Sequence, residues 1–436
     1  MMLVDRGPLS TAYVTHASPD DVASLHRRVT VRRRGVAVSA ARIRFGGAPH
    51  EHAFDSLELP VSALEVGPGD EVLASIASDE VTGALLVARG GQVEAGFPFF
   101  DWEARCLDES YVDLSQPLYS KLPVSYAVVP FPVRAALLRV AGAVRAKRAP
   151  KAAAPVASFP EYPVCGVVDR MRAEILRGVS LGQPSTPARG TLVLTHDMDE
   201  LAALPGVEKL RAIERRHGMT SAWGILSKKY LLPSDAVESL VREGCEIFSH
   251  GYLHDGRLPY LSRDEQLRRL RHFFDAYPML RGRTVGFRCG QLARSRSLYA
   301  AVQQVFEYDL TPPTTERGGP YGARSGVSTL FPFWNEGGLL HLPLTVPQDY
   351  FLAFVEKLSG PEIADRWIAA TSYVLEMGGV AVHLVHPDNV LRAPTLLDAY
   401  DRFLQWARDE RVEIRLPGEV ARRIGARPVA PSSVPA

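Results

Sequence analysis

Two aspartates and two histidines have the types and spacing of a metal-binding set. Asp197 and Asp199, separated by one residue, follow the apolar run 191–194, and His250 and His254 lie further along the chain. Residues two apart on an extended chain point to the same side, so both carboxylates can share one site. Two histidines four apart lie on one side of a helical turn. One carboxylate and two imidazoles form a three-ligand metal set with positions open for water and substrate.

A parallel sheet would bring these residues together. From about residue 158 to residue 427, apolar runs alternate with amphipathic segments, which is the pattern of repeating β-α units. The expected strands are 191–195, 221–226, 245–248, 284–287, 380–385 and 412–416. The expected helices are 207–217, 234–243, 263–277, 295–306, 363–377, 395–408 and 418–424. Such units predict a sheet closed into a barrel, with the chemistry at the carboxyl ends of the strands.

Other polar residues stand at the ends of expected strands in the same region. They are Arg288, Asp309 and His386. Each is a weak signal by itself: His386 alone reads as a buried core histidine, and a lone His-x-x-x-His pair arises by chance. Asp197 and Asp199 alone could cap a strand or form the Asp-x-Asp of a nucleotide-sugar glycosyltransferase, although no nucleotide-binding fold is evident. Their shared placement at strand ends favours one catalytic site.

The ordered motifs resemble those of the polysaccharide deacetylase family (NodB-homology domain, carbohydrate esterase family 4). The matching segments are Thr195-His196-Asp197-Met198-Asp199, Ser249-His250 through His254, Phe287-Arg288-Cys289, Tyr308-Asp309 and Leu384-Val385-His386-Pro387. The resemblance covers roughly residues 190–425 and implies a distorted (β/α) barrel. The usual family motif has adjacent aspartates, whereas Met198 separates them here, as in an Asp-x-Asp variant, and Cys289 stands where proline or another small residue often follows the arginine. These differences concern the substrate more than the chemistry.

The resemblance implies a role for each residue. The metal ligands would be Asp199, His250 and His254. The ion would be zinc, with cobalt or nickel as alternatives. Asp197 would be the general base that deprotonates a metal-activated water, and Arg288 would pair with it. His386 would be the general acid, and Asp309 would orient His386 or raise its pKa.

Three aromatic residues are candidates for contacts with the substrate: Tyr252, Trp334 and Tyr350. A backbone N–H near Tyr252 would help to stabilise the oxyanion, as the family suggests. Trp334, Tyr350 and Asp349 could line a sugar site from the irregular stretch 312–347 and the residues after it, while Trp334 could equally pack that loop. The remaining histidines of this region are expected to be structural, although His196 lies close to the site. They are His196, His341 and His383.

Composition limits the class of protein. The chain has 436 residues, 46% of them hydrophobic, which is enough for two or more domains with apolar cores. Its 50 basic and 49 acidic residues give a net charge of +1, so no overall field favours nucleic acid. The four cysteines form no CxxC pair, which favours a reducing compartment. The start of the chain lacks the apolar core of a secretory signal, and prolines and arginines interrupt the apolar stretch 124–144, so we expect a cytoplasmic protein without a transmembrane segment.

Four segments are expected along the chain. Residues 1–110 form a small β-rich N-terminal domain, 111–157 a connecting helix and an Ala/Pro/Lys-rich linker, 158–427 the barrel, and 428–436 a disordered tail. Residues 133–147 have the pattern of an amphipathic basic helix that packs on the main domain or lies on a membrane surface. A peripheral membrane contact and the oligomeric state therefore stay open.

The expected function is a metal-dependent deacetylase that hydrolyses the N-acetyl group of an amino sugar. Its substrate would be a free, nucleotide-linked or lipid-linked precursor of a polysaccharide or glycolipid. Two alternatives stay open. One is a metal-dependent hydrolase of a non-sugar C–N bond, such as a ureide or small amide, and the other is a non-catalytic glycan-binding module.

Overall fold

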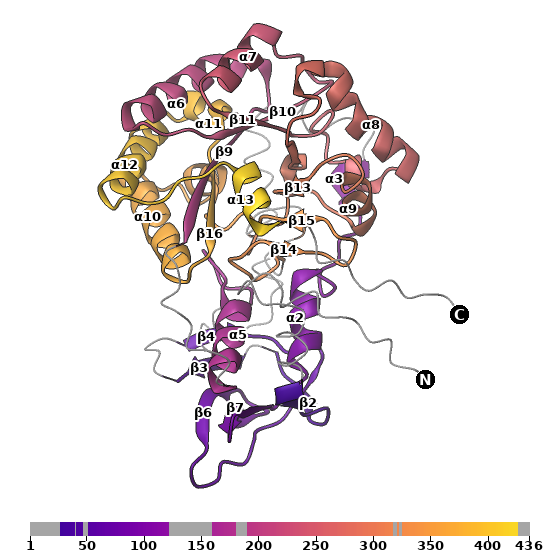
Figure 1. Cartoon of the computed structure of the whole chain (residues 1–436), viewed down its shortest axis with the longest axis vertical. Helices are drawn as coiled ribbons and strands as arrows, with labels where there is room; N and C mark the ends of the chain where they lie inside the picture. Colours follow the sequence, from indigo (N-terminus) through magenta and orange to yellow (C-terminus); the bar gives the residue numbers. More distant parts are fainter. Residues whose placement is uncertain are drawn as a thin grey trace.

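The computed structural model describes residues 27–39, 41–46, 51–121, 159–179, 190–316, 321 and 325–425. These residues form a small β-rich domain and a larger α/β barrel, at the bottom and top of Figure 1. The expected α/β class, with a distorted barrel after a β-rich N-terminal domain, is confirmed. The expected helix at 133–147 and the expected tail at 428–436 lie outside the described residues.

The N-terminal domain contains a six-stranded sheet in the order β1-β8-β7-β6-β3-β4. Its strands are β1 (Val29–Val31), β3 (Ala41–Phe45), β4 (Glu51–Phe54), β6 (Glu71–Ala77), β7 (Thr82–Arg89) and β8 (Gln92–Ala95). Two further strands, β2 (Val36–Ala37) and β5 (Pro60–Val61), pair with each other. Alternate side chains are buried, as in β3, where Ala41, Ile43 and Phe45 face the core and two arginines face solvent.

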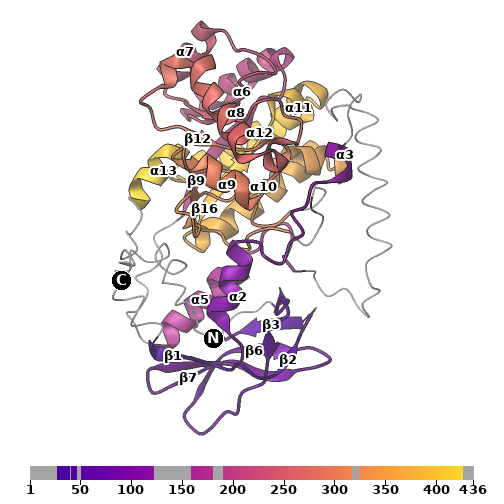
Figure 2. The same ribbon diagram turned by 90° about the vertical axis from the view of Figure 1, so that its right-hand side faces the viewer.

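Two helices cover the buried face of this sheet. They are α2 (Phe99–Leu107) and α5 (Val167–Gly178), which lie between the sheet and the barrel in Figures 1 and 2. Trp102 of α2 and Met171 and Ile175 of α5 are fully buried in one apolar cluster with residues of the sheet. Helix α5 therefore packs in the core of the N-terminal sheet, although its residues fall within the range expected for the barrel. A short helix, α3 (Leu118–Lys121), follows α2.

The barrel is built on an eight-stranded sheet in the order β14-β15-β13-β12-β11-β10-β9-β16. Its strands are β9 (Thr191–Asp197), β10 (Ala222–Ile225), β11 (Glu246–Ser249), β12 (Gly286–Phe287), β13 (Tyr308–Asp309), β14 (Phe333–Trp334), β15 (Leu340–His341) and β16 (Val380–Leu384). Every neighbouring pair is parallel except β14 with β15. After β15, the Val346 N–H donates to the Val382 carbonyl, which joins the two ends of the sheet into a distorted ring.

Helices surround this ring (Figure 1). The longer ones are α6 (Leu204–His217), α7 (Ser234–Arg242), α8 (Arg263–Ala276), α9 (Arg296–Val302), α10 (Gly360–Glu376), α11 (Pro387–Arg392), α12 (Thr395–Asp409) and α13 (Pro417–Ile424). The expected helices of this region are present within a few residues at each end. The expected strand at 412–416 is reduced to a single bridge between Ile414 and Leu192. No helix of the described residues is long and apolar enough to cross a membrane.

Alternation along the strands sorts side chains into two layers. Val193, Phe248 and Tyr308 belong to the apolar cluster inside the ring. Their neighbours in the chain, such as Leu192 and Ile247, belong to the cluster between the sheet and the surrounding helices. The direction of each residue after a strand end follows from this alternation, because successive side chains on extended backbone point to opposite faces.

Candidate metal centre

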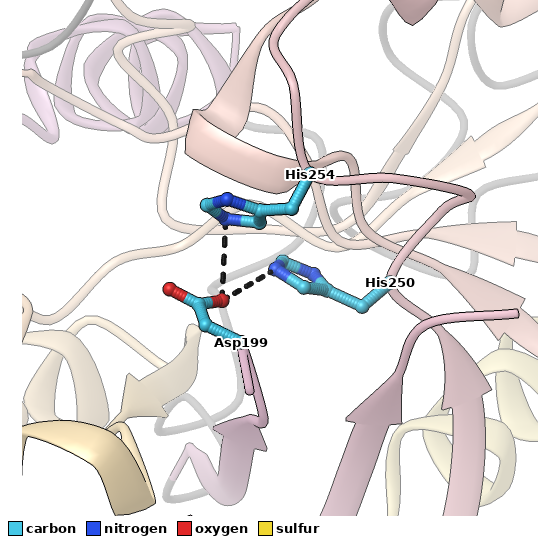
Figure 3. A group of neighbouring side chains, drawn as sticks. All are labelled: Asp199, His250 and His254. Carbon is cyan, nitrogen blue, oxygen red and sulfur yellow. Dashed lines mark ion pairs between the residues drawn. The ribbon is translucent and has the colours of Figure 1, made fainter. Parts of the chain in front are cut away.

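Asp199, His250 and His254 meet at the carboxyl end of the sheet. The Asp199 Oδ1 atom lies 3.3 Å from Nε2 of His250 and 3.2 Å from Nε2 of His254. Figure 3 shows the three side chains pointing toward one another, and their candidate ligand atoms all lie within 4.8 Å of each other. The predicted three-ligand set is thus assembled in space. Asp197 and Asp199 also lie on the same side, as their spacing predicts, and Met198 between them is buried in the outer apolar cluster.

The polar atoms of this set have the environment that a cation needs. Among the described residues, Asp199 Oδ1 and His250 Nε2 are buried and have no hydrogen-bond partner. The Nδ1 atom of His250 lies 3.1 Å from the Arg288 carbonyl oxygen, an acceptor, so Nδ1 carries the ring proton. The lone pair of His250 Nε2 therefore faces a carboxylate oxygen, an arrangement that a cation between them would stabilise.

The ionisation of the ligands suits a divalent metal. Burial lowers the pKa of His254 to about 4, so the imidazole is neutral at neutral pH and can coordinate an ion. Burial acts to raise the pKa of Asp199, but the neighbouring imidazoles of His254 and His250 outweigh burial and hold that pKa below its usual value. One ionised carboxylate and two neutral imidazoles are a donor set typical of zinc, and cobalt or nickel would also fit.

The backbone that carries His254 differs from the expectation. The two histidines lie on an irregular loop after β11 rather than on a helical turn, and His254 has a left-handed φ of 55°. Gly290 allows His254 to approach the next loop, because a Cβ atom at this glycine would lie 2.4 Å from the imidazole Cδ2. A Cβ atom at Gly224 would likewise lie 2.7 Å from Oδ1 of Asp197. Both glycines leave room for candidate site residues.

Asp197 and Arg288 form a buried ion pair inside the ring. Arg288 Nη1 lies 3.1 Å from Asp197 Oδ1 and also donates to the Thr195 hydroxyl, and its Nε donates to the Leu310 carbonyl. Both charged side chains are almost completely buried, and the guanidinium lies over the ring of Phe248. The other Asp197 oxygen, Oδ2, lies 3.5 Å from Nδ1 of His250. Asp197 is therefore paired with Arg288 and held next to the candidate metal ligands.

His386 is held by Asp349 and not by Asp309. Its Nδ1 lies 2.7 Å from Oδ1 of Asp349, and its backbone N–H donates to Oδ2 of the same carboxylate. Burial alone would lower the pKa of His386, but Asp349 outweighs burial and raises that pKa to about 10. The charges of Asp199 and Asp197 also raise the pKa of His386.

The expected role of Asp309 toward His386 is corrected by its direction. Tyr308, the residue before it, points into the ring, so Asp309 points outward. Its carboxylate contacts His341 Nδ1 at 2.8 Å, and it also accepts a hydrogen bond from the Thr311 backbone. His341 in turn contacts Asn335, and the whole group is packed on the outer face of the sheet. This Asp–His pair is thus separated from the ring interior by the sheet itself.

Two residues of the site had no signal in the sequence analysis. The carboxylate of Asp388 accepts a hydrogen bond from the Asp199 backbone N–H, and the side chain of Asn389 donates to Asp349. Both follow His386 at the start of α11, directly after Pro387. In the sequence, only their position could have indicated them, because polar residues in the first turn of a helix that follows a strand end lie beside the site.

The substrate-binding candidates lie in three different settings. Tyr252 stacks with Arg268 and Arg269 of α8, and its carbonyl accepts hydrogen bonds from two backbone N–H groups of the loop after β10. Trp334 packs against the apolar cluster inside the ring. Tyr350 follows Asp349 and donates its backbone N–H to that carboxylate. Of the three, Tyr350 is bonded directly to the group that holds His386.

The histidines expected to be structural lie on the outer face of the sheet. His196 contacts Glu214 at 2.7 Å and stacks on Trp223, while His383 lies between Trp367 and Phe403. Both point away from the ring interior, as the alternation of β9 and β16 requires. Neither contributes a ligand to the cluster of Asp199.

Comparisons with known proteins give similarities of structure only. No protein-family model and no curated protein matches the sequence. A Mycobacterium smegmatis protein assigned to the polysaccharide deacetylases is similar to this chain, with a TM-score of 0.46 and 18% identity over 56% of this chain and 92% of the other. Puue allantoinase has a TM-score of 0.45 and 16% identity, over 57% of this chain and 95% of the other.

A third similar structure, from Pseudomonas aeruginosa PAO1, is also assigned to the polysaccharide deacetylases. Its TM-score is 0.44 and its identity 16%, over 56% of this chain and 95% of the other. The solved structures similar to this chain thus include members of the family that its motifs resemble.

Proposed function

We propose that this protein is a metal-dependent hydrolase that removes the acetyl group from the nitrogen of an amino sugar. The observation that carries the proposal is the grouping of three sets at one end of the barrel: the Asp199–His250–His254 cluster, the Asp197–Arg288 pair and the Asp349–His386 pair. Amide hydrolysis needs an activated water, a base and an acid, and each set supplies one of them.

The residues would divide the work as follows. A divalent ion held by the three ligands would polarise the amide carbonyl and lower the pKa of a water molecule. Asp197, oriented by its ion pair with Arg288, would accept the proton from that water. His386, protonated at neutral pH because Asp349 raises its pKa to about 10, would donate a proton to the departing amine nitrogen. The burial of both pairs keeps their geometry fixed before the substrate binds.

The amino-sugar substrate is supported by the motif resemblance. The order Asp-x-Asp, His-x-x-x-His, Arg, Leu-x-His resembles that of polysaccharide deacetylases. The partner of His386 is Asp349 and not Asp309. A glycan precursor is the substrate class that this resemblance implies. The metal itself, zinc in the first instance, is part of the proposal.

The test combines metal analysis with product release. Purified protein would be analysed for bound metal and incubated with a panel of N-acetylated amino sugars and of ureides and small amides, with acetate and ammonia measured. Three variants separate the roles: His250→Ala should lose metal and activity together, Asp197→Asn should keep metal and lose activity, and His52→Ala, in the N-terminal domain, should change neither.

Each outcome has a defined meaning. Stoichiometric metal with acetate release that Asp197→Asn abolishes would support the deacetylase. If the protein binds metal but hydrolyses only ureides or small amides, the substrate is not an amino sugar, and the proposed metal chemistry stands. Absence of metal after reconstitution, with full glycan binding, would favour a binding module and overturn the proposal.

A further inference from the structure

Three exposed leucines stand in the segments that follow three neighbouring strands, at the end of the barrel that carries the candidate metal centre. Among the described residues, the large apolar side chains that are well exposed are three valines of the N-terminal domain and three leucines of the barrel. The leucines are Leu201, Leu231 and Leu391, exposed by 41%, 59% and 37%. Single exposed apolar residues are ordinary on a protein surface, so the position of these three relative to one another decides whether they matter.

All three leucines lie at the carboxyl end of the sheet. Leu201 follows β9, Leu231 lies between β10 and α7, and Leu391 is in α11, directly after β16. The strands β16, β9 and β10 are neighbours in the sheet, so the loops after them are neighbours as well. We call these residues the rim leucines.

Contacts between the loops hold the rim together. The Tyr230 hydroxyl donates to the Met198 carbonyl, which ties the loop of Leu231 to the segment that leads to Leu201. Arg392 and Glu200 form an ion pair next to Leu391 and Leu201. The 3-10 turn η2 (Leu201–Ala203) also packs against α11.

The rim leucines lie on one side of the proposed metal centre. Leu201 is two residues from the candidate ligand Asp199, and the Asp388 carboxylate of α11 bonds the backbone of that ligand. In the loop of Leu231, Lys228 and Lys229 donate backbone N–H groups to the carbonyl of Tyr252, between the two candidate histidine ligands. The rim leucines and the candidate ligands therefore lie at the same end of the barrel, in connected loops.

The charge of the rim is cationic around its apolar residues. Within the described residues, the side chains of Lys228 and Lys229 form no ion pair, and Lys228 is exposed. Glu200 is paired with Arg392, and the exposed carboxylate of Asp235 stands at the start of α7. Exposed leucines with unpaired lysines beside them are the composition of surfaces that bind anionic lipid.

We propose that the rim leucines and Lys228 and Lys229 dock this protein on an anionic lipid surface, with the metal centre facing the headgroups. The leucines would enter the boundary between headgroups and acyl chains, and the lysines would contact lipid phosphates. Resting on the proposed function, this geometry gives the substrate class: an amino sugar linked to an apolar chain and presented at the membrane. The lipid-linked precursor is then selected over the free and nucleotide-linked forms.

The experiment is vesicle co-sedimentation of the full chain. Vesicles of phosphatidylcholine alone would be compared with vesicles that also contain phosphatidylglycerol. The rim variant carries Leu201→Glu, Leu231→Glu and Leu391→Glu. Its matched control carries Val36→Glu, Val66→Glu and Val72→Glu, which add the same charge at the exposed valines of the N-terminal domain.

The expected result is binding to the anionic vesicles that falls about tenfold or more in the rim variant and stays within twofold in the control. A further variant, Lys228→Ala with Lys229→Ala, should bind less tightly and with weaker salt dependence. Bound metal, measured for each variant, should be unchanged, because none of these side chains is a ligand.

The proposal is overturned if the wild-type protein binds neither vesicle, if the rim variant binds as tightly as wild type, or if the control loses as much as the rim variant. These readouts are independent of catalysis. If the wild-type protein binds metal and releases acetate but binds neither vesicle, the docking surface is refuted and the proposed function stands. If the protein binds no metal, the proposed function is refuted, and the vesicle result still tests the docking surface.

Discussion

The Asp388 carboxylate accepts a hydrogen bond of 3.0 Å from the backbone N–H of Asp199, the candidate carboxylate ligand. Asp388 is two residues after His386, and its neighbour Asn389 donates to the carboxylate that holds His386. One short segment, His386-Pro387-Asp388-Asn389, thus contacts both the candidate ligand Asp199 and the carboxylate of Asp349. Asp388 acts through Asp199, so it is a positioning residue.

Replacing Asp388 is expected to weaken metal binding. Asp388→Leu removes the acceptor of the Asp199 N–H and leaves that group unpaired, so the ligand loop is held less firmly. We expect a loss of metal affinity of about 10- to 100-fold, measured by competition with a chelator. Asp388→Asn retains an acceptor oxygen and should lie closer to wild type. Asp398→Asn, at an exposed position of α12, serves as the control, and equal metal affinity of Asp388→Leu and wild type would contradict the assignment.

Replacing Asp349 is expected to move the alkaline limb of the pH profile. The carboxylate raises the pKa of His386 to about 10, so His386 keeps its proton through neutral pH. Asp349→Asn removes that charge, and the limb of kcat governed by loss of the His386 proton should shift to lower pH, with kcat at neutral pH falling about tenfold or more. The matched variant is Asp309→Asn, which lies on the outer face and contacts His341. If Asp309→Asn shifted the limb and Asp349→Asn did not, the acid pair would be wrongly assigned.

Gly290→Ala is expected to displace His254. The added Cβ would lie 2.4 Å from the imidazole Cδ2, closer than any stable contact, so the ring must move away from Asp199. Bound metal should fall sharply, while the melting temperature changes less, because Gly290 lies in a loop. Gly67→Ala, where the nearest atom is a carboxylate oxygen at 3.4 Å, provides the control substitution. Full metal occupancy in Gly290→Ala would argue that His254 is not a ligand.

Glu246 is expected to make the fold more stable in mild acid. It stands at the amino end of β11, accepts hydrogen bonds from the Tyr308 hydroxyl and the Gly418 N–H, and burial raises its pKa from 4.5 to about 7. The folded protein therefore holds this proton more tightly than the unfolded chain. The stabilisation is complete below about pH 4.5 and is lost as the pH rises through 7.

Urea unfolding at several pH values measures this effect. In Glu246→Gln the free energy of unfolding should fall less between pH 4.5 and pH 7 than in wild type. Glu238→Gln, at an exposed position of α7, should reproduce the wild-type curve. Parallel curves for wild type and Glu246→Gln would refute the assignment.

Periodicity and strand ends were sufficient to predict the barrel and the grouping of Asp199, His250 and His254. The β-α pattern is long and regular, and each ligand candidate stands within a few residues of an apolar run, so its position on the sheet edge followed from chain order. Asp309 lies at a strand end, as predicted, but its side chain is on the outer face of the sheet and not on the inner face. Strand β13 is only two residues long, Tyr308–Asp309, and a strand of this length has no alternation from which its inward face can be read.

Asp349 shows the opposite difficulty. It follows an irregular stretch rich in proline and glycine, where neither helical nor strand periodicity places a side chain. Its position depends on the hydrogen bonds that carry the chain from β15 back to β16, and these are contacts between residues far apart in sequence. The packing of α5 against the N-terminal sheet was likewise not indicated, because a single amphipathic helix does not specify which sheet covers it.

The guanidinium of Arg294 shows how the two domains depend on each other. It is fully buried in the barrel and forms two hydrogen bonds, of 2.5 and 2.6 Å, with Glu109, which follows α2 of the N-terminal domain. A barrel expressed alone from residue 158 would leave this guanidinium with Glu316 as its remaining carboxylate partner, and would expose the apolar face of α5. The barrel is therefore not a module that can be cut out at residue 158, because α5, on its side of that boundary, packs in the core of the N-terminal sheet.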